Sequence, residues 1–278
     1  MTTDEKFNAL KESLHHMERV IIAYSGGVDS TFLLKAASLS GLKDILAVTS
    51  ASNSLPKEEL DFSKEMTSSL DIRHKIIETE ELQDENYSNN PPDRCYYCKK
   101  ELFGSLRSIA KEDDFSFILD GTNADDKEDW RPGRRAAFEN GVHSPLLDAG
   151  FSKSEIRDIS RALGLPTWDK PATPCLSSRF PYGEKITAAG LERVELAENF
   201  IRQFGFKELR VRDHAGTARI EIISDDFKIC MMEEVRPRIL SYLKSLGYKY
   251  ITLDLQGFRS GSMNESIKKP KNLQVDSL

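Results

Sequence analysis

The sequence lacks any apolar run long enough to cross a bilayer. Its longest runs, residues 20–23 and 45–48, have four residues each, whereas a membrane-spanning helix needs about 20. We also expect no signal peptide, because Asp4, Glu5 and Lys6 precede the first apolar run. The sequence therefore predicts a cytoplasmic protein without a membrane partner, and its first residues predict a short amphipathic helix.

A surplus of positive charge is absent as well. The 278 residues carry a formal net charge of −6, with an isoelectric point near 5.6, whereas proteins that grip long nucleic acids usually present a basic surface. We therefore expect no nucleic-acid partner. Hydrophobic residues make up 39% and charged residues 30% of the chain, which is typical of a globular protein with one large or two ordinary domains.

Cysteine is scarce. Four cysteines in a chain without an export signal argue against a disulfide framework and favour metal binding or thiol chemistry. Cys95 and Cys98 form a C-x₂-C pair where a loop enters a helix, which is half of a zinc or iron–sulfur site. Cys175 lies in a separate proline-rich segment and would complete a set of three thiolates.

Several interpretations of these cysteines stay open at this point. Three thiolates on a four-iron cluster leave one iron open for chemistry, whereas His74 or His143 as a fourth ligand would make a structural zinc site. A redox pair and separate free thiols are further alternatives. Cys230 lies in an apolar stretch with helical spacing, so we expect it to pack in a core.

The chain changes character along its length. Residues 20–165 alternate short apolar runs with helical patterns, which is typical of a parallel α/β sheet, and a compact α+β pattern follows from Thr187. Ser152 is expected to cap a helix over 153–163. The expected domains are 1–165, a linker over 166–185 that carries Cys175, a second domain over 186–265, and a tail over 266–278. The strands expected in the first domain are 20–24, 45–49, 73–77 and 115–119, and the expected loops include 79–94 and 124–144.

The first expected strand runs into Ser25-Gly26-Gly27-Val28-Asp29-Ser30 and then into a helix. Two glycines let the backbone turn tightly and bring N–H groups against phosphate oxygens, and the helix N-terminus adds partial positive charge. The hydroxyls of Ser25, Ser30 and Thr31 are expected to donate further bonds. No Lys-Ser or Lys-Thr pair follows the glycines, so this is not the P-loop of ordinary NTPases. A glycine turn without function is the alternative.

Asp120-Gly121-Thr122 follows the fourth expected strand. Because ligands of open α/β sheets bind at the carboxyl ends of strands, this tripeptide is expected to share a nucleotide pocket with the glycine loop. The alternative is a plain turn at the end of a strand.

Charged residues in the second domain suggest an anion site. Arg210 and Arg212 alternate on one strand and so share a face, where paired guanidinium groups would suit a phosphate; a solvated strand face is the alternative. Glu195 and Glu198 lie one helical turn apart and are either surface carboxylates or close to a substrate. Arg179, near Cys175 in sequence, would stabilise developing negative charge.

The glycine loop resembles the PP-loop of ATP pyrophosphatases, which split ATP between its α and β phosphates. Other motifs narrow this superfamily resemblance, and the chain resembles the LarE family from about residue 17 to 265. LarE proteins are ATP-dependent sulfur transferases of nickel-pincer nucleotide biosynthesis, which serves lactate racemase. The motifs are Asp120-Gly121-Thr122, Trp130-Arg131-Pro132-Gly133, Cys175-Leu176-Ser177-Ser178-Arg179-Phe180-Pro181-Tyr182-Gly183, Arg210-Val211-Arg212 and Gly257-Phe258-Arg259-Ser260-Gly261.

The resemblance implies an adenine nucleotide alpha hydrolase-like PP-loop domain followed by a smaller α+β domain. It implies that ATP and Mg²⁺ adenylate a carboxylate of a pyridinium dicarboxylate mononucleotide, a small-molecule nucleotide substrate, with release of pyrophosphate. Sulfur then displaces AMP, and a thiocarboxylate remains. Members of the family tend to be homo-oligomers. The residues implied to bind ATP are Ala23, Ser25, Gly26, Gly27, Asp29, Ser30, Asp120, Gly121 and Thr122. Those implied to act in catalysis are Cys175, Asp29 and Arg179, with Arg210 and Arg212 on the substrate phosphate.

The chain departs from the best-known form of the family, in which a single cysteine, matched by Cys175, donates its sulfur and is consumed. Cys95 and Cys98 make it resemble the three-cysteine branch, in which a [4Fe–4S] cluster on Cys95, Cys98 and Cys175 carries the transferable sulfide. We favour the cluster over the sacrificial cysteine. The rival functions are a PP-loop tRNA thiolase, an adenylating ligase that uses ammonia, and a regulatory nucleotide-binding module with a structural zinc.

Overall fold

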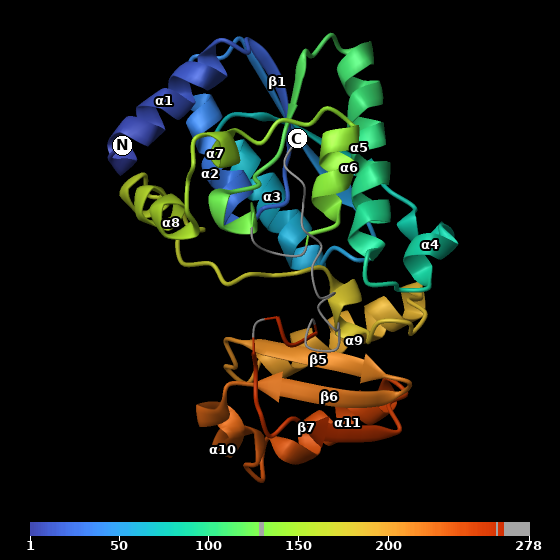
Figure 1. The fold of residues 1–278 in the computed structure, drawn as a ribbon. Coiled ribbons are helices and arrows are strands. Elements are labelled where there is room, and N and C mark those ends of the chain that lie inside the picture. Colours follow the sequence, from blue (N-terminus) through green and yellow to red (C-terminus); the bar gives the residue numbers. More distant parts are fainter. Residues whose placement is uncertain (128–130, 260, 264–278) are drawn as a thin grey trace, which may run out of the picture. The chain divides into compact units, whose positions relative to one another are not determined.

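The computed structural model describes residues 1–127, 131–259 and 261–263 (Figure 1). The chain forms two compact units, Met1–Leu176 and a second that begins at Ser177, and the division falls within the segment 166–185. Trp130, Ser260 and the expected tail 266–278 lie outside the described residues. Within the described part, no helix is both long enough and apolar enough to cross a membrane.

The first unit is built on a parallel sheet of four strands in the order β3-β2-β1-β4, which confirms the expected α/β fold. Val20 of β1 pairs with Ile45 of β2 on one side and with Phe117 of β4 on the other. The strand order therefore reverses between β1 and β4, which is where open α/β sheets bind ligands. The strands are β1 (Arg19–Ala23), β2 (Asp44–Ala51), β3 (Arg73–Glu78) and β4 (Phe117–Leu119).

Alternate residues of β1 belong to two different hydrophobic cores, as the pleat of a strand requires. Val20 and Ile22 pack with residues of α1, α2 and α8, whereas Ile21 and Ala23 pack with residues of α5 and α6. Helices therefore cover both faces of the sheet (Figure 1). The helices are α1 (Thr3–His15), α2 (Val28–Ser38), α3 (Lys57–Ser69), α4 (Glu85–Ser88), α5 (Arg94–Glu112), α6 (Gly133–Glu139), α7 (Pro145–Asp148) and α8 (Lys153–Ala162).

Two segments that were expected to be loops contain helices. Residues 79–94 hold α4 and a 3₁₀ turn at Glu81–Gln83, and residues 124–144 hold α6. In α6 the small residues Ala136 and Ala137 are buried in the core that includes α5. Two alanines next to arginines form an apolar face that is too short to show the hydrophobic periodicity by which a helix is predicted from sequence.

The expected cap of α8 is confirmed. The Ser152 side chain accepts a hydrogen bond from the backbone of Glu155 (3.3 Å), and the Glu155 carboxylate accepts one from the backbone of Ser152 (2.9 Å). This capping box satisfies two amides that the helix start leaves without intrahelical acceptors. It fixes where α8 begins, and therefore where Lys153 lies.

The second unit has a three-stranded sheet in the order β5-β6-β7, antiparallel between β5 and β6 and parallel between β6 and β7. The expected α+β character is confirmed, and Cys230 packs in the core of this unit, 7% exposed, as predicted. The elements are α9 (Ala188–Arg202), β5 (Leu209–His214), β6 (Thr217–Ile222), α10 (Phe227–Cys230), α11 (Arg236–Ser245) and β7 (Tyr250–Leu253).

Candidate active site

The glycine loop Ser25–Ser30, called the phosphate loop from here on, joins β1 to α2. Gly26 has a φ of 72°, in the left-handed region that favours glycine, and Gly27 is the N-cap of α2 without a side-chain cap among the described residues. The first amides of α2 are thus left for an anion. The Ser25 and Ser30 hydroxyl oxygens lie 3.1 Å apart at the same loop. Thr31 does not face it as expected, because Thr31 is fully buried and its hydroxyl lies 3.2 Å from that of Tyr24.

The end of β4 lies directly against the phosphate loop. A Cβ atom added to Gly121 would stand 2.9 Å from the backbone nitrogen of Ser30, so only glycine allows the two segments to approach this closely. Asp120 shapes the turn: its carboxylate accepts hydrogen bonds from the Thr122 amide (3.1 Å) and the Ser144 hydroxyl (2.7 Å). The structure therefore brings together the two motifs that the sequence predicted to share a pocket.

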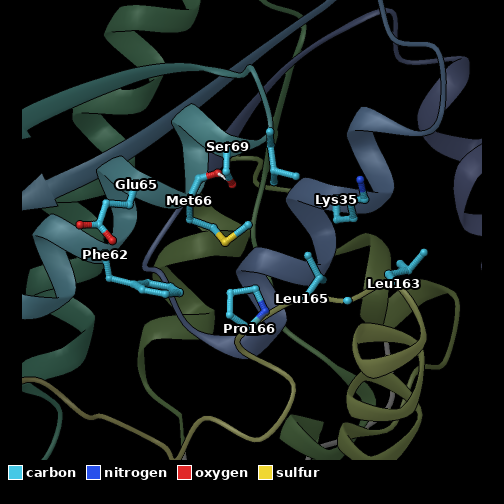
Figure 2. A pocket seen from close by; sticks show the side chains of 10 residues that line it. Lys35, Phe62, Glu65, Met66, Ser69, Leu163, Leu165 and Pro166 are labelled. Atoms are coloured by element: carbon cyan, nitrogen blue, oxygen red, sulfur yellow. Dashed lines mark hydrogen bonds between the residues drawn. The ribbon is translucent and has the colours of Figure 1, made fainter.

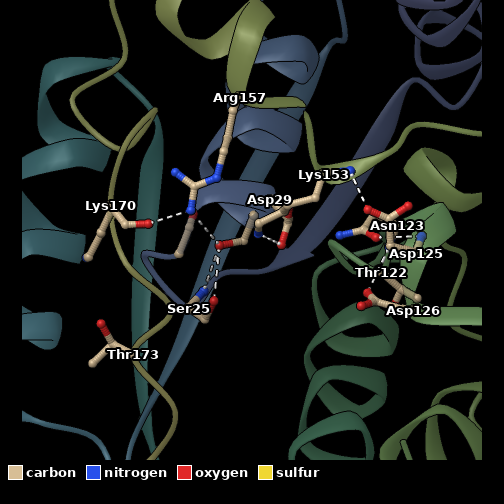
Figure 3. Close-up of polar contacts among 12 residues, drawn as sticks. Ser25, Asp29, Thr122, Asn123, Asp125, Asp126, Lys153, Arg157, Lys170 and Thr173 are labelled. Atoms are coloured by element: carbon tan, nitrogen blue, oxygen red, sulfur yellow. Dashed lines mark hydrogen bonds and ion pairs between the residues drawn. The ribbon is translucent and has the colours of Figure 1, made fainter. Parts of the chain in front are cut away.

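A lysine far along the chain also reaches the phosphate loop, and no spacing in the sequence reveals it. Lys153 places its Nζ 2.5 Å from Oδ2 of Asp29 (Figure 3). Its backbone N–H donates to Asp125 (2.9 Å), in the segment that follows β4. The other oxygen of the Asp29 carboxylate, Oδ1, is buried and accepts no hydrogen bond within the described residues. A carboxylate oxygen that lacks a donor suits a divalent cation, so Asp29 fits the predicted magnesium role.

A second lysine fixes the segment after α8 against the same loop. Lys170 Nζ donates to the Gly26 carbonyl (3.1 Å) and to the Glu59 carboxylate (2.7 Å). Arg157 of α8 in turn donates to the backbone carbonyl of Lys170 (2.8 Å; Figure 3). The first part of the expected linker is therefore held in the first unit beside the phosphate loop.

The three cysteines predicted to act together all lie in this unit. Cys95 and Cys98 lie in the first five residues of α5, and Cys175 follows the segment anchored by Lys170. The next residue, Leu176, donates its backbone N–H to the Ser54 carbonyl (2.8 Å), which lies just beyond β2. As whole residues, Cys95 is exposed and Cys98 and Cys175 are half-buried, but the Cys95 thiol itself lies among protein atoms.

The thiols lie within electrostatic range of one another. Desolvation by the surrounding protein raises the pKa of both Cys95 and Cys98, and the charge of Cys175 raises the pKa of each further. The buried carboxylate of Glu81, which accepts from the hydroxyls of Ser54 (3.0 Å) and Thr79 (2.8 Å), also raises the pKa of Cys98. A metal that binds these thiols would displace their protons.

The donor set fits an iron–sulfur cluster in its chemistry, because cysteine thiolates are the usual ligands. Over the ranges 1–127, 131–259 and 261–263, no three His, Cys, Asp or Glu side chains stand in metal-binding geometry. Neither histidine belongs to such a group. Both ring nitrogens of His74 face hydroxyls, of Thr67 (3.1 Å) and Thr49 (2.8 Å), and the His143 ring packs against Phe117.

In the second unit Arg179 forms a buried ion pair. Its Nε and Nη2 donate to the two carboxylate oxygens of Glu198 at 2.8 and 2.9 Å, and each residue is 3% exposed. Glu198 also accepts the backbone N–H of Val211 (2.9 Å). The interpretation of Glu198 as a surface carboxylate is therefore wrong. Glu198 is buried and holds the guanidinium of Arg179 in one orientation.

Replacing Glu198 with glutamine is expected to lower the free energy of unfolding by about 3–5 kcal/mol, because Arg179 is then buried without a counter-charge. Urea denaturation measures this loss. Glu192→Gln, at an exposed position of the same helix, is the matched control and should change stability by less than about 0.5 kcal/mol. Equal effects of the two variants would contradict the buried pair.

Arg210 and Arg212 differ in their partners although both lie on β5. Arg212 donates to both oxygens of Glu221 (2.8 and 3.0 Å). Arg210 is 7% exposed, forms no ion pair with the described residues, and lies with its guanidinium 4.6 Å from the ring centre of Phe258. Burial and the charges of Arg179 and Arg212 lower its pKa to about 10. A buried guanidinium beside other cations favours an anionic ligand.

A shallow pocket of about 350 Å³ lies elsewhere in the first unit, between α2, α3 and the segment after α8 (Figure 2). Phe62, Met66 and Leu165 give it an apolar wall, and Lys35 and Glu65 add charges. None of the predicted site residues lines this pocket, so we assign it no part in the chemistry.

No family model matches the chain, but curated proteins do. It is 41% identical over 266 residues to an uncharacterized protein of Synechocystis sp., covering 96% of this chain and 99% of that protein. It is 38% identical over 269 residues to pyridinium-3,5-bisthiocarboxylic acid mononucleotide synthase of Lactiplantibacillus plantarum, covering 96% and 97%. A weaker match, 24% identical over 195 residues, is to the tRNA-specific 2-thiouridylase MnmA of Desulforamulus reducens and covers 55% and 53%.

Proposed function

The chain belongs to the LarE family of sulfur transferases, and we propose that it uses ATP to convert the carboxylates of a pyridinium dicarboxylate mononucleotide into thiocarboxylates. The family resemblance of the motifs is thereby confirmed. The relative from Lactiplantibacillus plantarum is named for the corresponding bisthiocarboxylic acid product. The reaction belongs to nickel-pincer cofactor biosynthesis, and we expect the enzyme to act as a homo-oligomer in the cytoplasm.

One observation carries the proposal: the phosphate loop and the three thiols share one compact unit. The segment that leads to Cys175 begins at the loop, where Lys170 bonds to the Gly26 carbonyl (3.1 Å). It ends beyond β2, where Leu176 bonds to the Ser54 carbonyl (2.8 Å). A carboxylate activated at the loop would therefore be close to a source of sulfur.

Adenylation comes first. A substrate carboxylate oxygen bonds to the α phosphorus of ATP, the bond from that phosphorus to the bridging oxygen breaks, and the electron pair leaves with pyrophosphate. The amides and hydroxyls of the phosphate loop would hold the β and γ phosphates. Asp29 would hold Mg²⁺, which neutralises phosphate charge when it is bound.

Sulfur transfer follows. A sulfur nucleophile bonds to the carbonyl carbon of the acyl adenylate, and the carbon–oxygen bond to AMP breaks with its electron pair on AMP. Cys95, Cys98 and Cys175 would ligate a [4Fe–4S] cluster, which supplies an open iron for the transferable sulfide. Without a cluster, Cys175 itself would attack and then lose its sulfur by elimination, leaving dehydroalanine.

The test is to incubate the anaerobically purified protein with ATP, Mg²⁺ and the pyridinium dicarboxylate mononucleotide. We expect pyrophosphate release that depends on the mononucleotide, and replacement of its carboxylate oxygens by sulfur in the mass spectrum. Pyrophosphate release with tRNA but not with the mononucleotide would instead favour a thiolase, the class named for the weaker match.

Arg210 is expected to bind the phosphate of the mononucleotide. The Arg210→Met variant should raise the KM for this substrate by about 10- to 100-fold, the value of a charge-assisted hydrogen bond, and leave the affinity for ATP unchanged. Steady-state kinetics with each substrate varied in turn measures the two effects. Arg210→Lys keeps the charge and should recover part of the loss. An unchanged KM in both variants would place the phosphate elsewhere.

A further inference from the structure

We propose that Glu81 is a positioning residue that sets the place of Cys175 relative to Cys98, through hydrogen bonds that run over Ser54. Only the task of the two thiols, the delivery of sulfur, rests on the proposed function. The contacts that carry the inference all lie within the first unit, and Glu81 belongs to none of the motifs found in the sequence.

Glu81 is a buried carboxylate held by hydroxyl groups. It begins the 3₁₀ turn that follows β3, and only 2% of the residue is exposed. Oε1 accepts a hydrogen bond from the Ser54 hydroxyl (3.0 Å) and Oε2 accepts one from the Thr79 hydroxyl (2.8 Å). In the part of the chain that the structure describes, these hydroxyls are its hydrogen-bond partners, and no cation is among them. A buried carboxylate depends on such donors.

The carboxylate also fixes the direction of the neighbouring hydroxyls. Each hydroxyl has one proton to donate. Because Ser54 and Thr79 donate theirs to Glu81, they accept from the hydroxyls of Ser52 (2.9 Å) and Ser50 (2.5 Å), respectively. Four hydroxyls from the ends of β2 and β3 and the residues just beyond them therefore converge on one acceptor, and a network that is satisfied in this way is rigid.

Ser54 connects this network to Cys175. Its hydroxyl donates to Glu81, and its backbone carbonyl accepts the N–H of Leu176 (2.8 Å), the residue after Cys175. Ser54 is 4% and Leu176 1% exposed, so water does not compete for these bonds. Residues 171–175 form neither helix nor strand, so the position of Cys175 depends on contacts of this kind.

The same turn is bound to α5, which carries Cys98. The backbone N–H of Glu80 donates to the carboxylate of Glu101 (2.6 Å), which lies one helical turn after Cys98 on the same face of α5. Burial, and then the charge of Glu81, raise the pKa of Cys98. The turn that holds Glu81 is therefore joined by hydrogen bonds to both of the segments that carry thiols.

Two thiols that act on one group have to be held at one spacing, since small displacements at a reacting site lower rates steeply. Cys98 comes from a regular helix, whereas Cys175 comes from an irregular segment. Glu81 supplies the fixed point between them. Its loss is expected to free the segment of Cys175 and to leave α5 in place.

The experiment measures how closely the two thiols are held, with phenylarsine oxide as the probe and without iron or ATP. Its arsenic bonds to two thiol sulfurs and releases its oxygen as water with the two thiol protons, so the affinity depends on whether the second thiol is within reach. Cys95→Ser is the parent protein, in which the arsenical has to bridge Cys98 and Cys175, because Cys230 is buried in the core of the second unit. The double variant Cys95→Ser/Cys175→Ser gives the affinity without a bridge.

In this parent, Glu81→Leu should weaken binding of the arsenical about 10- to 100-fold, because Ser54 loses its acceptor and Cys175 loses its fixed position. If Glu81 acted only as a negative charge, its removal would ease ionisation of Cys98 and tighten binding. The sign of the change therefore separates positioning from charge. Glu81→Gln keeps one acceptor oxygen and should recover part of the affinity.

Ser54→Ala is the second variant, which removes a single hydroxyl. It should weaken binding in the same direction, and adding it to Glu81→Leu should cause little further loss, because both changes break the same link. Ser63→Ala is the matched control. It removes an equally buried hydroxyl, which donates to the Leu60 carbonyl within α3 (2.6 Å), and should leave the affinity unchanged.

Unchanged or tighter binding in both Glu81→Leu and Ser54→Ala would overturn the inference, and so would a parent protein that binds no better than its Cys175→Ser derivative. If Glu81→Leu does not fold, the comparison of Ser54→Ala with Ser63→Ala decides alone. With all cysteines present, Glu81→Leu should lower thiocarboxylate formation but keep pyrophosphate release that depends on the mononucleotide. Absence of that release from the wild-type protein would refute the proposed function and leave the arsenical result standing, so the two failures are distinct.

Discussion

Replacing Cys175 with serine should reduce formation of the thiocarboxylate by at least about 1000-fold, the scale on which loss of a reacting group acts, while adenylation continues. The reason is a division of tasks within the first unit. In the proposed function pyrophosphate would leave at Ser25–Ser30, whereas Cys175 lies beyond the segment that Lys170 fixes to the loop. Coupled measurement of pyrophosphate and mass spectrometry of the mononucleotide separate the two steps.

The same experiment on Cys95→Ser and Cys98→Ser distinguishes the two sulfur sources. A cluster on three thiolates predicts that all three variants lose sulfur transfer, together with iron and the absorption of the cluster. A sacrificial Cys175 predicts that only the Cys175 variant fails and that the wild-type protein gains dehydroalanine after one turnover. Full thiocarboxylate formation by Cys175→Ser would contradict both mechanisms.

Gly121→Ala should weaken ATP binding by about 100-fold or more, the effect of a misplacement of about 1 Å at a reacting site. The added Cβ would stand 2.9 Å from the nitrogen of Ser30 and 3.2 Å from its Cα. Both are backbone atoms, so no side chain can rotate away, and the phosphate loop itself has to move. Equilibrium dialysis with labelled ATP measures the loss.

Gly104→Ala is the control for this variant. Gly104 lies inside α5, and a Cβ there would meet nothing within 4 Å, so the change should stabilise the helix by about 1 kcal/mol and leave ATP binding intact. Comparable ATP affinities of the two variants would show that the contact between β4 and the phosphate loop does not matter for the nucleotide.

The parts of the site that the sequence predicts are those encoded within a few consecutive residues. Ser25–Ser30 combines a strand exit, two glycines and a helix start, so its geometry follows from local rules. Ser152 likewise predicts the start of α8, because its capping partner Glu155 is three residues away. The meeting of Gly121 with the loop also follows, since both segments lie at the carboxyl ends of strands.

The parts that the sequence does not reveal depend on contacts between distant segments. Lys153 and Lys170 reach the loop only after the fold places α8 and the following segment beside it, and nothing in their neighbours marks them as binding residues. Glu198 is one carboxylate among several on α9, and only burial against Arg179 sets it apart. The helix α6 was missed for the same reason, because its apolar face is defined by α5.

The boundary between the compact units has a consequence for how such enzymes can change their substrates. It falls after Leu176, one residue beyond Cys175, so the phosphate loop and the three cysteines Cys95, Cys98 and Cys175 are encoded in one continuous stretch of the sequence. Arg210 and the two arginines whose charges act on it, Arg179 and Arg212, belong to the second unit. Under the proposed function, recombination at this junction would keep the residues that activate a carboxylate and exchange only the unit that carries Arg210.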